Sequence, residues 1–279
     1  MKKSISIWSF AEGMKIVDCM KMAKDAGFDA IELALNETGE MGLQSSKDEI
    51  LGYRKAADEI GIEISSLATG LYWSYTLTSD NEKIREKAKS IVKKQLDAAS
   101  LLGVDTILVV PGAVGVDFVP DSEVIAYDVA YERALEAMKE LAPYAESKKV
   151  YIGIENVWNK FLLSPLEMRD FIDEVGSDYV GSYFDVGNVI YSGYPEHWIK
   201  ILGKRIKKVH FKDYRKDVGT LSGFVDLLSG DVNFPAVIEE LKNVGYDSYV
   251  TAEMIPPYKN YPEQIVYNTS LAMDKILGR

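Results

Sequence analysis

Four residues in the second half of the chain have side chains that can bind a cation or transfer protons: Glu155, Asp185, His210 and Glu253. Each ends a short apolar run rich in β-branched residues, and a turn or loop is expected after each one. If the four runs are consecutive parallel strands, the four side chains meet at one end of the sheet. Three carboxylates and one imidazole are a ligand set for an oxygen-preferring divalent cation, with carboxylates also available for proton transfer.

Each of these residues also has a simpler interpretation. A carboxylate at a strand end is more often a helix cap or a solvated loop residue. A lone histidine is more often a hydrogen-bonded core residue than a ligand. The prediction therefore depends on the joint pattern, since four successive units carry such a residue at the same position. The other histidine, His197, stands at an expected helix start, and we interpret it as a structural or surface residue.

A repeated pattern positions these four residues along the chain. A helical stripe is followed by glycine, one further residue, an acidic residue and an apolar run, with the glycines at Gly27, Gly61, Gly103, Gly176 and Gly245. Glycine at this place is typical of the left-handed residue just past a helix end, and the short connection is typical of βαβ units. The pattern predicts strands at about residues 4–8, 29–35, 62–68, 105–110, 150–155, 180–185, 206–211 and 249–254.

Alternating strands and helices without a linker predict one α/β domain over residues 1–279, and eight units in this length predict a closed (β/α)8 TIM barrel. An open doubly wound sheet is the alternative. That fold usually has a glycine-rich phosphate loop after its first strand, and residues 8–13 do not form one. In a (β/α)8 barrel the chemistry lies at the C-terminal ends of the strands. The four residues end predicted strands 5 to 8, so we expect them to be neighbours around half of the rim.

Composition argues against several classes of protein. The net charge of −11 disfavours nucleic acid as a partner, because phosphate binding needs a basic surface. No apolar run reaches about 18 residues, so no membrane span is expected. The apolar segment at the N-terminus is too short for a signal peptide. The single Cys19 cannot form an internal disulfide, which fits a cytoplasmic location. A homo-oligomer, either dimer or tetramer, is compatible with the sequence.

Four segments around these residues carry a resemblance to a known family. They read Gly-Ile-Glu155-Asn, Phe-Asp185-Val-Gly-Asn188, Val-His210-Phe-Lys-Asp and Thr-Ala-Glu253-Met. They resemble the xylose-isomerase-like sugar epimerases and isomerases. This group includes D-tagatose and D-psicose 3-epimerases, L-ribulose-5-phosphate 3-epimerases and hexulose-6-phosphate isomerase relatives. The resemblance covers essentially the whole chain and is most specific over residues 150–255.

The resemblance implies a metal centre and its catalytic residues. Glu155, Asp185, His210 and Glu253 match the quartet that binds one divalent metal in that family, commonly manganese, with Co²⁺ or Mg²⁺ as alternatives. The two glutamates match the acid and base. The family also includes inosose dehydratases and endonuclease-IV-like repair enzymes. The latter use a three-zinc site rich in histidine, which the two histidines of this chain cannot build.

One position departs from the free-ketose 3-epimerases. Those enzymes carry a histidine three residues after the metal-binding aspartate, where it contacts the substrate, and this chain has Asn188 there. Asn188 looks more like the ribulose-phosphate 3-epimerase branch, which acts on phosphorylated sugars. A free ketose and a ketose phosphate therefore both remain expected substrates.

Further residues near the strand ends are predicted to contact the substrate. Lys212 and Arg215 follow His210 and could bind a sugar hydroxyl, stabilise enediolate charge or hold a phosphate, with a solvated basic face as the alternative. Trp8 and Trp158 could pack on the apolar face of a sugar, with loop packing as the alternative. The same ambiguity applies to Tyr72 and Trp73. Glu32 is expected either to make a polar contact at the rim or to be a buried hydrogen-bonded carboxylate. Residues 219–231 form a long predicted loop of the kind that often serves as a lid.

The predicted function is metal-dependent epimerisation or isomerisation of a ketose or ketose phosphate. The metal acidifies the C–H next to the carbonyl of an α-hydroxyketone. Glu155 and Glu253 then face opposite sides of that carbon, so one removes a proton, a cis-enediolate forms, and the other returns a proton to the far face. Two alternatives remain open. A dehydratase of a keto-polyol would expel a β-hydroxyl with the same metal and base, and a non-catalytic sugar-binding barrel would do neither.

Overall fold

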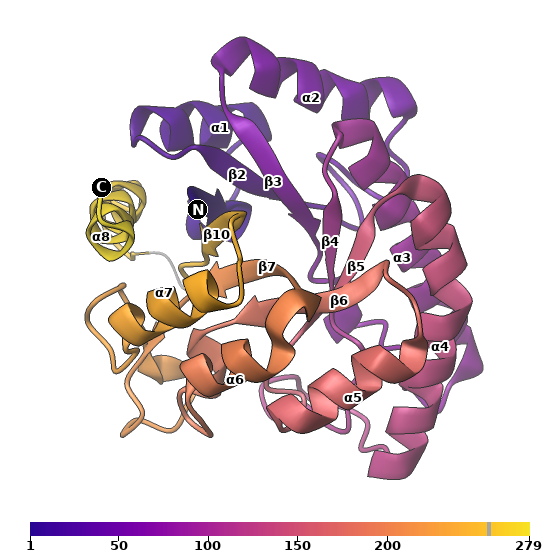
Figure 1. The fold of residues 1–279 in the computed structure, drawn as a ribbon. Coiled ribbons are helices and arrows are strands. Elements are labelled where there is room, and N and C mark those ends of the chain that lie inside the picture. Colours follow the sequence, from indigo (N-terminus) through magenta and orange to yellow (C-terminus); the bar gives the residue numbers. More distant parts are fainter. Residues whose placement is uncertain (256–257) are drawn as a thin grey trace.

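Eight parallel strands close into a barrel in this computed structural model, which describes residues 1–255 and 258–279. The order of strands around the barrel is β1-β10-β7-β6-β5-β4-β3-β2, and helices cover its outside (Figure 1). The predicted (β/α)8 barrel is confirmed. The barrel strands are β1 (Lys2–Ser6), β2 (Ala30–Ala34), β3 (Glu63–Ala68), β4 (Thr106–Val109), β5 (Tyr151–Glu155), β6 (Val180–Asp185), β7 (Ile206–Phe211) and β10 (Tyr249–Ala252).

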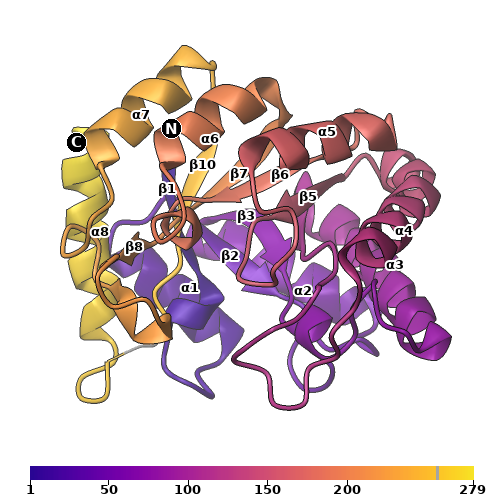
Figure 2. The same cartoon turned by 90° about the horizontal axis from the view of Figure 1, so that it is seen from below.

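The outer layer is a ring of α-helices around the strands (Figure 2). Parallel neighbours need a crossover connection, and a helix provides it between consecutive barrel strands. The last barrel strand pairs with the first, with Lys2 opposite Tyr249 and Ile5 opposite Ala252, and this pairing closes the barrel. The helices are α1 (Ile16–Asp25), α2 (Lys47–Ile60), α3 (Glu82–Leu102), α4 (Tyr127–Lys148), α5 (Pro165–Val175), α6 (Pro195–Leu202), α7 (Phe234–Asn243) and α8 (Gln264–Leu277).

The glycines between helices and strands adopt the predicted left-handed conformation. Their φ angles are 86° at Gly27, 75° at Gly61, 70° at Gly103, 72° at Gly176 and 76° at Gly245. A residue with a Cβ atom meets steric repulsion in this region, so glycine permits the chain to turn from helix into strand within one or two residues. These turns fix where each strand begins, and therefore also which residue ends it.

The hydrophobic core lies in two places. The larger part packs between the strands and the helices, and a small separate cluster of Ala68, Leu108 and Tyr183 lies together with Trp8. Polar side chains accompany this small cluster, because the Ser66 hydroxyl lies 3.0 Å from the Tyr183 hydroxyl and both residues are fully buried. These two hydroxyl groups also bind Glu32, which contacts His210.

Two predicted boundaries differ from the observed ones. The first strand ends at Ser6, so Trp8 lies in a short 3-10 turn, Ile7–Ser9, directly after it. The segment 219–231 is not a plain loop. Part of it forms a hairpin in which β9 (Phe224–Val225) pairs with β8 (Asp213–Tyr214). The Asp213 carboxylate anchors this hairpin by accepting hydrogen bonds from the backbone N–H groups of Tyr214, Gly230 and Val232.

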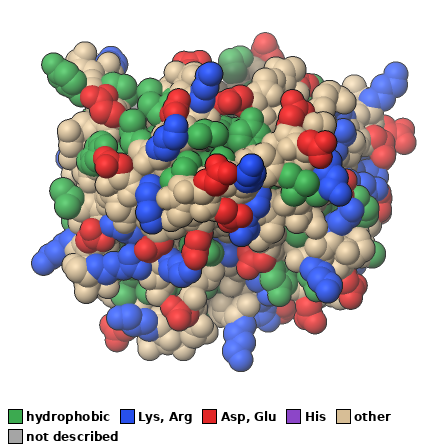
Figure 3. Space-filling view, turned by 90° about the horizontal axis from the view of Figure 1, so that it is seen from above, with side chains coloured by type: hydrophobic (Ala, Val, Ile, Leu, Met, Phe, Trp, Pro, Cys, Tyr) green, Lys and Arg blue, Asp and Glu red, His purple; other side chains and the backbone are tan. Residues whose placement is uncertain are grey.

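The surface shows charges of both signs. On the face drawn in Figure 3, Lys and Arg side chains are interspersed with Asp and Glu side chains. Of the helices in residues 1–255 and 258–279, none combines the length and apolar character needed to cross a membrane. The cytoplasmic location and the homo-oligomer stay predictions from the sequence.

Candidate active site

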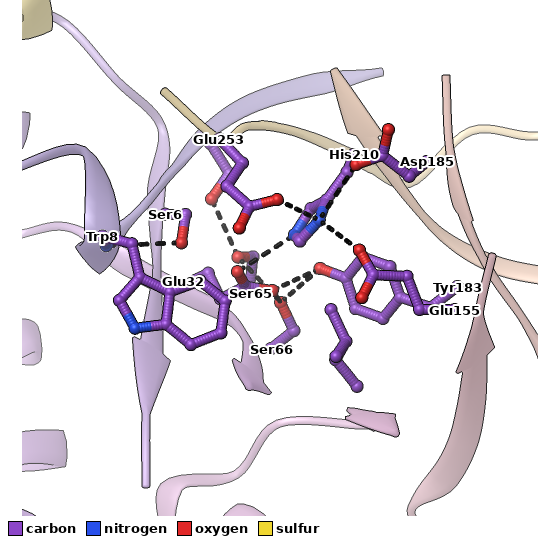
Figure 4. Close-up of polar contacts among 12 residues, drawn as sticks. Ser6, Trp8, Glu32, Ser65, Ser66, Glu155, Tyr183, Asp185, His210 and Glu253 are labelled. Carbon is purple, nitrogen blue, oxygen red and sulfur yellow. Dashed lines mark hydrogen bonds and ion pairs between the residues drawn. The ribbon is translucent and has the colours of Figure 1, made fainter. Parts of the chain in front are cut away.

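The four predicted ligands converge at the C-terminal end of the barrel (Figure 4). Glu155 and Asp185 end β5 and β6, His210 lies next to the end of β7, and Glu253 directly follows β10. Each residue offers one ligand atom, and these atoms all lie within 4.8 Å of one another. All four side chains are buried. Strand register explains the convergence, because Asp185 pairs with His210 and Thr251 pairs with the same histidine from the other side.

The His210 ring nitrogen Nδ1 faces the three carboxylates. It lies 3.2 Å from Glu253 Oε2, 3.4 Å from Glu155 Oε1 and 3.7 Å from Asp185 Oδ2. Among the described residues, His210 Nδ1 is a buried atom without a hydrogen-bond partner, whereas Asp185 Oδ2 and Glu253 Oε2 contact the Lys212 ammonium group. Donors about 2.0–2.2 Å from one ion lie roughly 3–4 Å from each other. The donor set therefore fits one divalent cation, which would also give His210 Nδ1 a partner.

Lys212 lies beside the same carboxylates. Its Nζ is 2.5 Å from Glu253 Oε2 and 3.2 Å from Asp185 Oδ2, and its side chain is 14% exposed. Burial raises the pKa of Glu155 to about 7. Burial acts on Glu253 in the same direction, but the charges of Lys212 and His210 outweigh it and hold its pKa at about 2. Two neighbouring carboxyl groups with separated pKa values can serve as an acid and a base near neutral pH.

Glu32 is a buried hydrogen-bonded carboxylate, one of the two interpretations that the sequence left open. It is fully buried and accepts hydrogen bonds from the hydroxyls of Ser66 and Tyr183. Its Oε1 lies 3.0 Å from His210 Nε2. A proton on Nε2 that is donated to Glu32 leaves Nδ1 free to act as a ligand. The sequence analysis missed this role, because Glu32 lies in the middle of β2, between Ile31 and Leu33, and not at a strand end as the four ligands do.

Replacement of Glu32 by glutamine is expected to weaken metal binding about 10- to 100-fold while the fold stays intact. The amide cannot hold His210 with the same charge and the same preference for the Nε2 tautomer. Metal affinity can be measured by competition with a chromogenic chelator, and folding by circular dichroism. Glu63→Gln is the matched control, because Glu63 lies in the neighbouring strand but binds Lys2 and Tyr249. Equal metal affinity in Glu32→Gln and the unmodified protein would contradict this role.

Two asparagines hold Asp185 in place. The Asn156 side chain accepts a hydrogen bond from the Asp185 N–H at 2.9 Å and donates one to the Asp185 carbonyl at 2.8 Å. The Asn188 backbone N–H donates to Asp185 Oδ1 at 2.8 Å, and its side-chain amide donates to the Asn156 carbonyl at 2.9 Å. The sequence analysis did not single out Asn156. The sequence feature that could have identified Asn156 is a short amide side chain directly after a predicted ligand at a strand end.

A cavity of about 540 Å³, here called the inner cavity, adjoins the quartet. Its wall includes Glu155, Glu253 and Lys212, and also three residues predicted to contact substrate: Trp8, Trp158 and Asn188. Most of the remaining wall is apolar or aromatic, formed by Trp73, Leu108, Val110, Phe118, Val157, Leu221, Phe224 and Ile255. The cavity can therefore hold a small molecule with one polar end at the quartet and apolar surfaces around it.

Three residues singled out in the sequence lie elsewhere. Arg215 is exposed, and its Nε donates a hydrogen bond to the Ser229 carbonyl at 3.1 Å, so its position lends no support to a substrate contact. Tyr72 is buried and its hydroxyl donates to Gln95, which indicates a packing role. His197 packs against Tyr194 with 5.3 Å between ring centroids, in agreement with its structural interpretation.

Several known proteins are similar to this chain in sequence or in fold. L-ribulose-5-phosphate 3-epimerase UlaE of Salmonella heidelberg (strain SL476) is 22% identical over 269 residues, which cover 91% of this chain and 88% of that protein. The structure of D-psicose 3-epimerase with D-tagatose from Clostridium cellulolyticum H10 superposes with a TM-score of 0.82 at 18% identity, covering 100% of this chain and 99% of that one. The IOLI protein with a binding zinc atom has a TM-score of 0.81 at 19% identity, and the match covers 100% of this chain and 98% of that one.

A family model supplies the assignment. The model of the xylose isomerase-like TIM barrel matches residues 20–269, which is most of the chain and includes the whole quartet. This match confirms the family resemblance carried by the four segments. The chain belongs to the xylose isomerase-like TIM barrel family.

Proposed function

We propose that this chain is a divalent-metal-dependent epimerase or isomerase of a ketose or ketose phosphate. The observation that carries the proposal is the set of four buried donor atoms within 4.8 Å of one another at the end of the barrel, beside a cavity of monosaccharide size or larger. The names of the relatives, L-ribulose-5-phosphate 3-epimerase and D-psicose 3-epimerase, support this reaction class. Mn²⁺ is the proposed ion, because carboxylate-rich sites suit it, with Co²⁺ or Mg²⁺ as substitutes.

The proposed mechanism assigns proton transfer to the two glutamates. A bound divalent cation would polarise the substrate carbonyl and make the neighbouring C–H more acidic. Glu155 comes from β5 and Glu253 from the end of β10, so the two carboxylates approach the site from different strands. One removes the proton from carbon, and the other returns a proton to the opposite face. Proton return to the neighbouring carbon would give an isomerase instead.

The other wall residues have supporting roles in this proposal. The Lys212 ammonium group lies within 3.2 Å of two of the quartet carboxylates and would stabilise negative charge that develops on a substrate oxygen. Trp8 and Trp158 would pack on the apolar face of the sugar. Asn188 orients Asp185 and lines the same cavity, so it would contribute to both the ligand geometry and the substrate pocket.

Incubation with candidate ketoses in deuterated water tests the reaction class. The panel contains D-fructose, D-psicose, D-tagatose, L-ribulose and L-ribulose 5-phosphate, each analysed by mass spectrometry and chromatography. An epimerase or isomerase incorporates deuterium on carbon, forms a second sugar and loses no water. Loss of water would instead favour the keto-polyol dehydratase, which uses the same base and cation. Binding of a sugar without deuterium exchange and without loss of water would favour a non-catalytic sugar-binding barrel.

A further inference from the structure

A second cavity, here called the outer cavity, has a volume of about 700 Å³ and adjoins the inner one. The two cavities share six lining residues: Phe118, Val157, Trp158, Asn188, Leu221 and Ser222. Each volume alone falls in the range of about 300–1,000 Å³ that drug-sized ligands fill. A monosaccharide at the quartet would therefore occupy the inner cavity and leave the outer cavity without a substrate group.

The wall of the outer cavity is aromatic and aliphatic. Its residues beyond the shared ones include Phe161, Leu162, Leu163, Val189, Tyr191 and Trp198. Phe161, Leu162 and Trp198 are buried, whereas Leu163 and Tyr191 are 62% and 60% exposed. Large apolar side chains that remain exposed beside a cavity are typical of ligand-binding grooves. This wall therefore suits an apolar or aromatic group of a ligand.

Trp158 lines both cavities and is held in position. Its indole N–H donates a hydrogen bond to the Asn188 carbonyl at 2.9 Å. Its ring packs against Tyr214 and Phe224, each with 5.4 Å between ring centroids, and against Tyr191 at 6.1 Å. A ligand that extends from the quartet into the outer cavity therefore meets a fixed aromatic surface.

The charged side chains of both walls already have partners. Lys160 of the outer cavity lies 2.6 Å from Asp117, and Lys212 of the inner cavity binds Glu253 and Asp185. Among the described lining residues, no other Lys and no Arg or His faces either cavity. A phosphate group needs charge-assisted donors, and in the outer cavity the Asp117 carboxylate offsets the charge of Lys160. The walls therefore disfavour an anionic substituent and favour an uncharged one.

We propose, on the basis of the proposed function, that the substrate is a keto-sugar with an uncharged apolar or aromatic substituent on an oxygen away from its carbonyl, such as an ether-linked aryl group. The α-hydroxyketone part occupies the inner cavity at the quartet. The substituent lies in the outer cavity against Trp158. This assignment makes the outer cavity the determinant of substrate choice, and it distinguishes this chain from an enzyme for ketose phosphates.

Three matched probes test the assignment: D-fructose, 6-O-benzyl-D-fructose and D-fructose 6-phosphate. They carry the same reacting atoms and differ only in the substituent on one oxygen. The rate of deuterium uptake from heavy water gives kcat/KM, and quenching of tryptophan fluorescence gives binding without turnover. A single methylene group in a fitted apolar pocket is worth about 10- to 200-fold, so the benzyl ether should exceed D-fructose by about tenfold or more in both measurements. A preference for the phosphate, or equal values for the ether and D-fructose, would overturn the assignment.

Two variants locate the effect in the outer cavity. Ser192 lines that cavity, and Ser192→Trp should fill it and remove the advantage of the benzyl ether over D-fructose. Tyr194→Trp is the matched control, because Tyr194 is exposed in the same loop and does not line either described cavity. Tyr194→Trp should keep the advantage of the benzyl ether over D-fructose. Persistence of the advantage in Ser192→Trp would place the benzyl group elsewhere and overturn the assignment.

The two readouts separate this inference from the proposed function. Tighter binding of the benzyl ether without deuterium uptake from any probe would contradict the epimerase proposal and still support an apolar ligand group in the outer cavity. Deuterium uptake at equal rates from D-fructose and its benzyl ether, with equal affinities, would support the epimerase and contradict the substrate assignment.

Discussion

Removal of divalent cations is expected to abolish turnover, and addition of Mn²⁺, Co²⁺ or Mg²⁺ is expected to restore it. The quartet offers four donor atoms within 4.8 Å of one another, and without a cation nothing there polarises the substrate carbonyl as strongly. The protein should be treated with chelator, desalted, checked for metals by elemental analysis and assayed for deuterium uptake. Full activity in a sample verified to be metal-free would contradict metal dependence.

The histidines provide a matched pair for this prediction. His210→Ala should lower metal affinity about 10- to 100-fold or more, because it removes a ligand and leaves Glu32 without its partner. His197→Ala should leave metal affinity unchanged, since His197 packs against Tyr194 away from the quartet. Equal metal affinity in both variants would exclude His210 as a ligand. Circular dichroism of both variants should match the unmodified protein, so that a folding defect is not mistaken for loss of a ligand.

Glu155→Gln and Glu253→Gln should each lower net epimerisation by about 10²- to 10⁴-fold. Glutamine keeps the shape and one ligand oxygen but cannot accept a proton from carbon. Metal content should therefore be measured with activity, so that loss of the ion is separated from loss of the acid or base. Glu123→Gln is the control, because this exposed carboxylate lies in the loop between β4 and α4, outside the quartet.

The two glutamine variants should differ in their half-reactions. With one substrate epimer, one variant should still exchange the substrate proton with solvent without inverting the carbon. The other variant should show neither proton exchange nor inversion. With the opposite epimer the two behaviours should exchange, because each glutamate serves one face of the carbon. Near-normal net turnover in either variant would make that glutamate a ligand only, and a mechanism with two bases would then be wrong.

The sequence by itself determined most of the strand ends and therefore the positions of the four residues of the quartet. Each left-handed glycine, such as Gly176 with a φ of 72°, sets the start of the next strand through local sterics. Strand length then decides which residue lies at the C-terminal end, and Asp185 and His210 were placed correctly by this argument. The boundaries of the first strand were less accurate, because Ser6 ends it early by accepting a hydrogen bond from the N–H of Trp8.

Only the tertiary structure decided the features that depend on contacts between distant segments. Glu32 and His210 are 178 residues apart, and barrel closure brings them within 3.0 Å of each other. Arg215 and Lys212 looked equivalent in the sequence. The hairpin anchored by Asp213 leaves the first exposed and the second beside the carboxylates. The outer cavity lies between loops after several strands. Local periodicity fixes the ends of strands, but the direction of a side chain in a loop depends on the segments that pack around it, and these are far away in sequence.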